Sequence, residues 1–331
     1  MRTKVRGLLR AALAALSTLA TAAALSQTGP ANYPVKPIRI VVPFSAGGPA
    51  DITTRTLTPR LTDLLGQSII VDNRAGATGI IGAELVAKSP PDGYTLLMAT
   101  ASVVAINMVT YSKLPYDTLR DLQPLTPVMT TSTVLVVHPS MPAKNLKELV
   151  ALARARPGQI SMGSAGNGGT LHLCLEMLMK AASVKITHVP YKGAAPAVVD
   201  VVAGQLNGMF VDLPVVSPYI KAGRVRPLAM ASAKRSVYFP DVPTTQEAGF
   251  PNVELQNYYA LLLPAKTPRD IVGKLHDAVV KTINTPAVHE KLVATGADPY
   301  TMTVEDFSRF LRADIERWDK VVKAAGVKIE P

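Results

Sequence analysis

"PFSAGGPADITTR", residues Pro43–Arg55, is the stretch that decides how this chain is expected to fold. It follows the apolar run "IRIVV", which is typical of a strand, and it leads into a helical pattern from Asp51 onward. Glycine at such a junction removes side-chain bulk, so backbone N–H groups can approach an anion while the helix N-terminus adds a favourable dipole. Asp51 is expected to be an N-cap or first-turn acid that orders the turn. The stretch therefore predicts an anion-binding turn between a strand and a helix.

Two further Gly-rich turns occur in the same setting, "NRAGATGIIG" and "GSAGNGGT". Each follows a predicted strand and precedes a predicted helix, which places the three turns at the carboxyl ends of parallel strands, where open α/β sheets bind ligands. The first of these two spaces its glycines G-x-x-G-x-x-G, so it is not a dinucleotide fingerprint. None of the three turns ends in the Gly-Lys-Ser/Thr of a P-loop. The turns therefore lack both of these nucleotide-binding signatures.

Strand-length apolar runs alternate with helical patterns, which predicts an α/β fold with largely parallel sheets. Two long β-rich passages, "VMTTSTVLVVHPS" and "VELQNYYALLLP", are expected to cross between two lobes and to form a hinge beside a closable cleft. The predicted first lobe contains residues 33–130 plus 254–331, and the predicted second lobe contains residues 131–253.

Two helices carry more specific expectations. Pro59 lies inside the first helical pattern and is expected to kink or shorten that helix. The last helical pattern has an apolar stripe that includes Phe307 and Trp318, and this stripe is expected to pack onto the first lobe.

The beginning of the chain predicts export. "MRTKVRGLLRAALAALSTLATAAALSQ" opens with basic residues and continues as an Ala/Leu-rich run that ends in small residues. This is the pattern of a signal peptide, and we predict that residues 1–26 are removed and that the mature protein is soluble and periplasmic. An uncleaved membrane anchor is the alternative reading.

Composition narrows the classes of function. The 331 residues are 48% hydrophobic and 5% aromatic, with a formal net charge of +11. A chain of this length can form two domains with a sizeable core, and its few aromatic residues argue against a nucleic-acid surface. The basic residues are scattered, so they favour either small anions or simple solubility. The single cysteine, Cys174, makes no internal disulfide, and the five scattered histidines predict neither a metal site nor a cofactor.

A serine hydrolase is the main enzymatic alternative. Ser164, His172 and Asp212 are residue types that could form a triad, but a triad is defined by geometry. An esterase elbow needs G-x-S-x-G, and Met162 stands where the first glycine should be. A structural role at the edge of the cleft is the expectation for His172.

Five stretches together resemble the Bug receptors, the extracytoplasmic solute-binding proteins of bacterial tripartite tricarboxylate transporters. The stretches are "YPVKPIRIVVPFSAGGPADITTR", "IIVDNRAGATGIIGAELVAKSPPDGYTLLMAT", "GSAGNGGTLHL", "VPYKGAAPAVVDVVAGQLNGMFVD" and "FPDVPTTQEAGFP". The resemblance implies a two-lobed periplasmic binding protein of type II-like fold, each lobe a mainly parallel sheet flanked by helices. It implies no catalysis, a monomer, and transfer of a small carboxylate (an amino acid, a di- or tricarboxylate or an aromatic acid) to the membrane subunits of a transporter. A ligand sensor for a signalling partner is the alternative.

The resemblance also implies which residues bind the ligand. Family members are similar in holding a carboxylate mainly through backbone amides and bridging waters, without an arginine clamp. Ser102, after the third strand, is expected to add a side-chain contact and to influence selectivity. The residues so assigned are Phe44, Ser45, Ala46, Gly47, Gly48, Asp51, Gly76, Thr78, Gly79, Ser102, Ser164, Gly166, Gly168, Gly169, Thr170 and Asp212.

Overall fold

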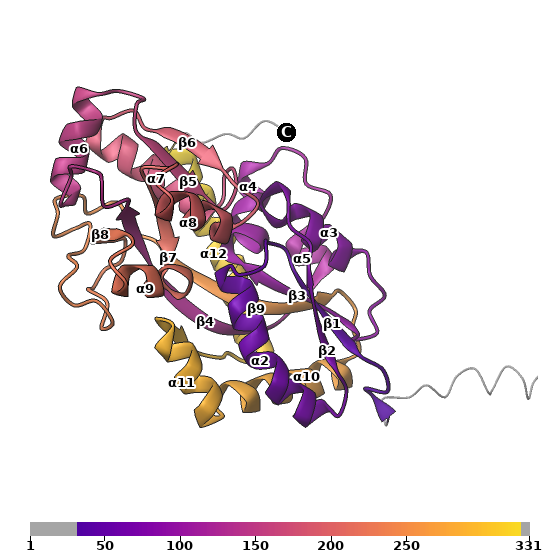
Figure 1. Ribbon diagram of the computed structural model, residues 1–331. Coiled ribbons are helices and arrows are strands. Elements are labelled where there is room, and N and C mark those ends of the chain that lie inside the picture. Colours follow the sequence, from indigo (N-terminus) through magenta and orange to yellow (C-terminus); the bar gives the residue numbers. More distant parts are fainter. Residues whose placement is uncertain (1–31, 326–331) are drawn as a thin grey trace, which may run out of the picture. The chain divides into compact units, whose positions relative to one another are not determined.

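The computed structural model describes residues 32–325, and the predicted signal peptide lies outside them. The chain divides into two compact units, Met1–Val35 and Lys36–Pro331, and the fold below is that of the second unit (Figure 1). Within the described part of the chain, no helix has both the length and the apolar character that a membrane span requires.

The unit is a mixed α/β fold with helices packed around a central sheet. The strands are β1 (Ile38–Val42), β2 (Ile69–Asn73), β3 (Thr95–Thr100), β4 (Leu122–Val137), β5 (Ser161–Ser164), β6 (Thr187–Pro190), β7 (Gly208–Asp212), β8 (Arg226–Met230), β9 (Gln256–Pro264) and β10 (Ala297–Pro299). The helices are α2 (Pro49–Leu65), α3 (Ile80–Ala87), α4 (Asn107–Thr110), α5 (Thr118–Asp121), α6 (Leu146–Ala155), α7 (Thr170–Ala182), α8 (Ala194–Val202), α9 (Leu213–Lys221), α10 (Arg269–Ile283), α11 (Pro286–Ala294) and α12 (Val304–Ala325), with short turns η2 (Ala77–Gly79) and η3 (Ser102–Ile106).

The ten strands form one continuous sheet in the order β2-β1-β3-β9-β4-β7-β5-β6, with β8 and β10 also paired to β4. The strands near each end of this order, β2-β1-β3 and β7-β5-β6, are parallel within their groups, whereas β9 and β4 run antiparallel to their neighbours. Within each group the carboxyl ends lie at one edge. The two groups run in opposite directions on either side of β9 and β4, so their carboxyl ends face each other and bring together the turns that follow β1, β3, β5 and β7.

Strand β4 belongs to both halves of the sheet. Its residues from Leu122 to Ser132 pair with β9, and those from Thr133 to Val137 pair with β7 and β8. We call β1–β3, β9, β10 and the first part of β4 the first lobe, and β5–β8 with the second part of β4 the second lobe. The lobe limits inferred from the sequence stay a prediction.

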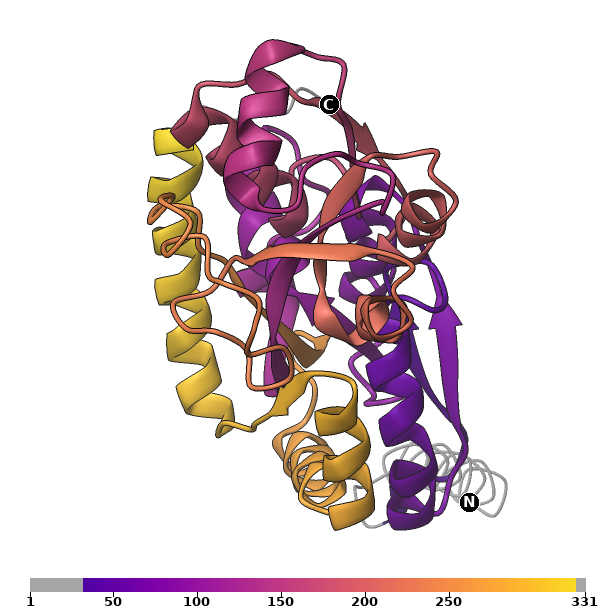
Figure 2. The ribbon, with the colours of Figure 1, turned by 60° about the vertical axis from the view of Figure 1, so that its left-hand side comes forward.

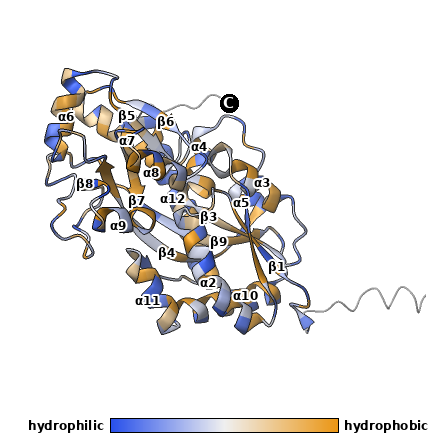
Figure 3. Ribbon diagram, viewed as in Figure 1, coloured by the Kyte–Doolittle hydropathy of each residue, from blue (hydrophilic) through white to orange (hydrophobic). Residues whose placement is uncertain are grey.

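The second lobe buries both faces of its sheet. Successive side chains of a strand point to opposite faces, so Val134 and Val136 join a cluster with Val198 of α8, while Leu135 joins one with Leu175 of α7. Each fully buried side chain of this size stabilises the fold by roughly 1.5–3 kcal/mol. Figure 3 shows β7 of this lobe in hydrophobic colours, as this two-sided burial requires.

Helix α2 continues past Pro59, so the shortening expected from the sequence does not occur. The helix has Pro49 at its first turn and ends at Gly66, which has the left-handed φ of 67° that glycine accepts readily. Pro59 lies on the exposed side, while Leu57 and Leu61 on either side of it are buried. Tertiary packing therefore keeps the helix continuous where local propensity would end it.

Helix α12 packs on both lobes, not on the first lobe alone as the sequence suggested. It contacts η3 and α4 of the first lobe and α7 of the second. Trp318 and Val322 lie in the same core cluster as Leu173 and Leu178 of α7. Figure 2 shows α12 in yellow, running from the level of the orange helices to that of the magenta ones. The apolar stripe of α12 is long enough to contact both lobes. The sequence pattern shows the stripe but does not specify which elements it packs against.

Candidate functional site

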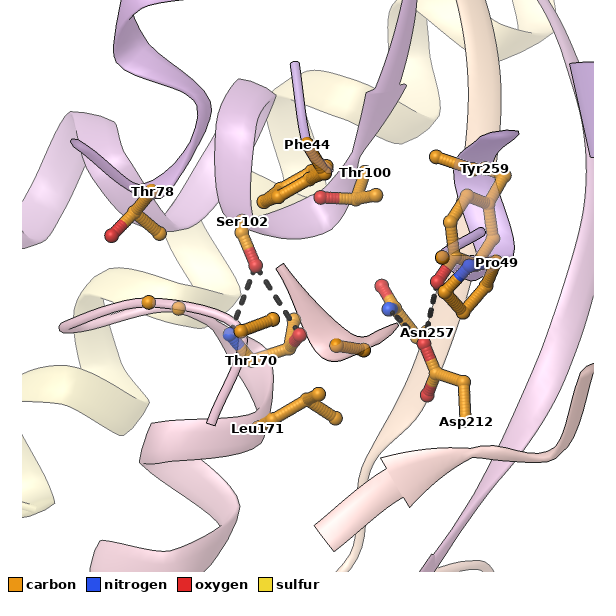
Figure 4. A pocket seen from close by; sticks show the side chains of 16 residues that line it. Phe44, Pro49, Thr78, Thr100, Ser102, Thr170, Leu171, Asp212, Asn257 and Tyr259 are labelled. Atoms are coloured by element: carbon orange, nitrogen blue, oxygen red, sulfur yellow. Dashed lines mark hydrogen bonds between the residues drawn. The ribbon is translucent and has the colours of Figure 1, made fainter. Parts of the chain in front are cut away.

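A pocket lies where the predicted turns of the two lobes meet (Figure 4). The space between its walls is about 450 Å³, including the part open to solvent. The walls come from strand ends and helix starts of both lobes. The lining residues are Phe44, Gly48, Pro49, Ala50, Thr78, Thr100, Ser102, Ala165, Gly166, Gly169, Thr170, Leu171, Ala194, Asp212, Asn257 and Tyr259.

Four helices begin at this pocket. Gly48 is the N-cap of α2, Gly169 that of α7, Gly193 that of α8 and Asp212 that of α9. Each N-terminus presents unpaired backbone N–H groups and the equivalent of roughly half a positive charge. The strand-to-helix junctions therefore give the pocket a positive potential that comes from the backbone.

The first turn is shaped by Asp51. The Gly47 N–H donates to Asp51 Oδ2 at 2.9 Å, and Arg55 Nε donates to the same carboxylate at 3.0 Å. Burial raises the pKa of Asp51, but the hydrogen bonds from Arg55 and Gly47 outweigh it, so the net pKa is lowered. Asp51 is thus a first-turn acid and Gly48 is the N-cap. Neither Asp51 nor Gly47 lines the pocket; together they fix the turn that does.

The second turn reaches across to the other lobe through Thr78. This residue has a left-handed φ of 51° and donates from Oγ1 to the carbonyl oxygen of Asn167 at 2.6 Å. Tyr111 donates to the same carbonyl at 3.0 Å. Asn107 Nδ2 donates to the carbonyl oxygen of Thr78 at 3.1 Å and holds its backbone in place. The two lobes are therefore in direct contact over the pocket.

The third turn, Ser164–Thr170, also makes direct hydrogen bonds to the first lobe. Ser102 Oγ accepts from the Thr170 N–H at 2.9 Å and donates to Thr170 Oγ1 at 3.2 Å, as the dashed lines in Figure 4 show. A Cβ at Gly166, whose φ is +151°, would lie 2.7 Å from Thr78 Oγ1. A Cβ at Gly169 would lie 3.1 Å from Ser102 Oγ. Glycine is needed at position 166 for this contact between the lobes, whereas a Cβ at position 169 would require Ser102 to shift by a few tenths of an ångström.

Asp212 forms a buried network at the side of the pocket where the crossing strands pass. Its Oδ1 accepts from Thr133 Oγ1 at 2.8 Å, and its Oδ2 accepts from Asn257 Nδ2 at 2.8 Å and from the Tyr259 hydroxyl at 2.6 Å. Burial raises the pKa of Asp212, and the three hydrogen bonds oppose this without cancelling it. Asp212 is the one carboxylate on the lining, and no Lys, Arg or His side chain is among the lining residues.

The residues of the hydrolase alternative do not form a triad. Ser164 Oγ lies 2.6 Å from Nε2 of His188, not of His172, and it is fully buried away from the pocket lining. His172 accepts from the Gly168 N–H, and Asp212 bonds neither histidine. Among residues 32–325, no group of three or more His, Cys, Asp or Glu side chains could hold a metal ion.

The structure brings half of the sequence-predicted residues to the lining and leaves the other half off it. Phe44, Gly48, Thr78, Ser102, Gly166, Gly169, Thr170 and Asp212 line the pocket. Ser45, Ala46, Gly47, Asp51, Gly76, Gly79, Ser164 and Gly168 do not. Their role as ligand contacts stays a prediction.

Sequence reasoning missed several lining residues. Asn257 and Tyr259 come from β9, which was predicted only as a crossing strand. A strand that crosses the hinge must pass the cleft, so polar residues in "NYYA" were the available signal. The other missed residues lie within two positions of a predicted turn or directly after Gly193, the N-cap of α8; they are Pro49, Ala50, Leu171 and Ala194.

Comparisons with known proteins give one consistent answer. Residues 53–327 match the tripartite tricarboxylate transporter family receptor. The protein BugT of Bordetella pertussis is 36% identical over 313 residues, covering 94% of this chain and 96% of that protein. A solved periplasmic transporter is 42% identical with a TM-score of 0.87, covering 90% of this chain and 99% of its own. Rpa4515 of R. palustris, solved with adipate, is 35% identical with a TM-score of 0.87, covering 91% of this chain and 100% of its own.

These matches confirm the predicted fold class, a two-lobed α/β periplasmic binding protein. They span nearly the whole of this chain and of the relatives, so the likeness includes both lobes.

Proposed function

Because the chain belongs to the tripartite tricarboxylate transporter family of receptors, we propose that its pocket binds a small carboxylate for delivery to a membrane transporter. Proteins of this family are solute-binding receptors and not enzymes. A similar protein, Rpa4515, has been solved with adipate. The proposal assigns binding of this kind to the pocket of Figure 4.

The observation that carries the proposal is an anion-friendly pocket without a cationic side chain. The N-termini of α2, α7 and α8 meet there, and the lining offers the hydroxyls of Thr100, which has no hydrogen-bond partner among residues 32–325, and of Thr170, which accepts from Ser102. The hydroxyls of Thr78, Ser102 and Tyr259 already donate to protein acceptors. Backbone N–H groups and hydroxyls donate to a carboxylate at fixed positions and add no mobile charge. Such a site binds an anion by geometry and helix dipole.

The predicted contact residues then divide into two roles. Those on the lining would face the carboxylate directly or through water, and Ser102 would do so from the π-helical turn after β3. Gly47, Asp51, Ser164 and Gly168 would act behind the lining, by holding the turns in shape. Asp212 would orient Asn257 and Tyr259 toward the ligand space.

A thermal-shift panel tests the proposal. We expect the mature protein to be stabilised by one or more of acetate, succinate, adipate and citrate, and not by adipamide, the uncharged counterpart of adipate. A ligand at 100 times its Kd should add about 2.7 kcal/mol to the free energy of unfolding. No product should form during the incubation. A panel in which the amide stabilises the protein as much as adipate does would contradict the proposal.

Export and partners belong to the same proposal. We infer that residues 1–26 are a cleaved signal peptide, that the mature protein acts in the periplasm as a monomer, and that membrane subunits of a tripartite transporter receive its ligand. The family and the periplasmic relatives support this. N-terminal sequencing of the periplasmic protein, with sedimentation to measure its mass, provides the check.

A further inference from the structure

A buried histidine, His172, and a half-buried one, His188, stack behind the third turn, Ser164–Thr170. The rings of His172 on α7 and His188 on β6 lie 3.7 Å apart between centroids, with 8° between their planes. We propose that His172 is a positioning residue that must be uncharged to hold this turn against the pocket, so that acidification releases the turn. The proposal concerns the turn itself, and only its effect on affinity rests on the proposed function.

His172 holds the turn through one ring nitrogen. Its Nδ1 accepts from the Gly168 N–H at 2.9 Å, and its Nε2 lies 3.2 Å from Glu176 Oε1. A nitrogen that accepts a hydrogen bond carries no proton, so the neutral ring must carry its proton on Nε2 and donate it to Glu176. Only 7% of His172 is exposed, so water cannot readily replace the Gly168 contact.

His188 holds the other end of the same turn. Its Nε2 lies 2.6 Å from Ser164 Oγ, which donates to the Gly166 carbonyl at 2.9 Å and accepts from the Gly166 N–H at 3.2 Å. Burial, and then the neighbouring His172, lower the pKa of His188 to about 4. His188 is therefore neutral near pH 7.

A proton on Nδ1 of His172 would face the Gly168 N–H, and two donors cannot bond each other. The groups around the ring act in opposite directions. Glu176 on α7 favours the imidazolium, while His188 on β6 and the Gly168 N–H disfavour it, and Ser164 on β5 is neutral. The cation can form only when the turn moves away, so release of the turn takes up one proton.

The turn also carries the contact between the lobes. Asn167, next to Gly168, accepts from both Thr78 and Tyr111 of the first lobe. Gly166, Gly169 and Thr170 line the pocket. Release of Gly168 would therefore loosen a wall of the pocket and the closed arrangement together.

The test uses the protein without ligand. Hydrogen exchange of the amides of residues 166–170, corrected for the intrinsic pH dependence, should lose protection by up to tenfold per pH unit below the pH at which His172 takes up its proton, because one proton is bound. Nitrogen-15 spectra of the histidine rings should show His172 with its proton on Nε2 at pH 8.

Three variants separate this role from a merely structural one. His172→Asn places an amide oxygen near the position of Nδ1 and cannot titrate, so we expect protection to be kept and its pH dependence to vanish. His172→Leu removes the acceptor and should lose protection at every pH. His289→Asn, at an exposed position on α11, should behave as the wild type.

Three results would overturn the proposal: protection in the wild type that does not change between pH 8 and pH 5, the same pH dependence in His172→Asn, or a His172 proton on Nδ1 at pH 8. If His172→Leu does not fold, the His172→Asn variant and the nitrogen-15 spectra of the histidine rings still test the proposal. Failure of carboxylates to bind would contradict the proposed function. It would not affect the test of His172, because those measurements use the protein without ligand.

Discussion

Gly166 lies against Thr78 where the two lobes meet, and this pair shows how much depends on single residues. We predict that Gly166→Ala weakens carboxylate binding by at least about tenfold, equivalent to about 1.4 kcal/mol, because its Cβ would lie 2.7 Å from Thr78 Oγ1. Isothermal titration with the best ligand of the panel measures this loss.

Gly158→Ala is the matched control, since this glycine has a φ of +75° and a Cβ there would meet nothing within 4 Å. It should cost some stability through backbone strain and leave the affinity unchanged. Equal effects of the two variants on affinity would show that closure does not need the Gly166 contact.

The charge of Asp51 makes the stability of the first turn depend on pH. Its net pKa is lowered from its ordinary value of 3.8, so its contribution to stability is present above that value and is lost as the pH falls through the lowered pKa. We predict that Asp51→Asn reduces the free energy of unfolding by about 1–2 kcal/mol at pH 7, because the amide loses the charge-assisted bonds to Gly47 and Arg55.

Urea unfolding at pH 7 and pH 3 measures the free energy of unfolding of both proteins. The difference between variant and wild type should be smaller at pH 3. Asp63→Asn, at an exposed position on the same helix, is the control and should change little. A gap of the same size at both pH values would mean that the charge of Asp51 contributes nothing.

At the scale of elements, Pro59 in α2 gives the clearest conflict between local preference and packing. Proline inside a helix removes a backbone hydrogen bond and costs up to about 3 kcal/mol relative to alanine. Pro59 is exposed, so we predict that Pro59→Ala raises the free energy of unfolding by about 1–3 kcal/mol without affecting the pocket.

Chemical denaturation of Pro59→Ala and Pro286→Ala tests this. Pro286 is exposed at the first turn of α11, where proline suits the helix, so its replacement should give no gain. A Pro59→Ala variant no more stable than the wild type would show that the helix has already adapted to its proline.

The elements also show what the sequence could and could not predict. Hydrophobic period and Gly-rich punctuation are local, so they located β1, β2 and β5 with the Gly-rich turns that follow them, and β3 and β7 as strands. The single strand β4, the reach of α12 over both lobes and the lining residues of β9 depend on contacts between distant parts of the chain, which no local pattern encodes. The direct contact of Thr78 with Asn167 was beyond prediction for the same reason.

At the scale of the whole unit, closure over the pocket is supported by hydrogen bonds between the lobes. We predict that the double variant Thr78→Ala, Tyr111→Phe binds carboxylate about tenfold more weakly, because it removes two donors to Asn167, each worth about 0.5–1.5 kcal/mol. The melting temperature without ligand should fall much less, since neither side chain belongs to the core clusters around α7 and α8.

Thr187→Ala is the control, because it removes a hydroxyl-to-carbonyl bond, to Gly158, that stays within the second lobe. Titration calorimetry and melting curves should be run on both proteins. An unchanged affinity in the double variant would mean that the ligand alone keeps the lobes together.

The place of β9 between β3 and β4 has a consequence for how the protein is made. During synthesis, β3 ends at Thr100, while its neighbour β9 begins only at Gln256. At about 5–20 residues per second, the ribosome takes on the order of ten to thirty seconds to supply the missing strand. Throughout that interval the nascent chain has an apolar strand edge without its partner, which favours adhesion to other chains unless a chaperone shields it.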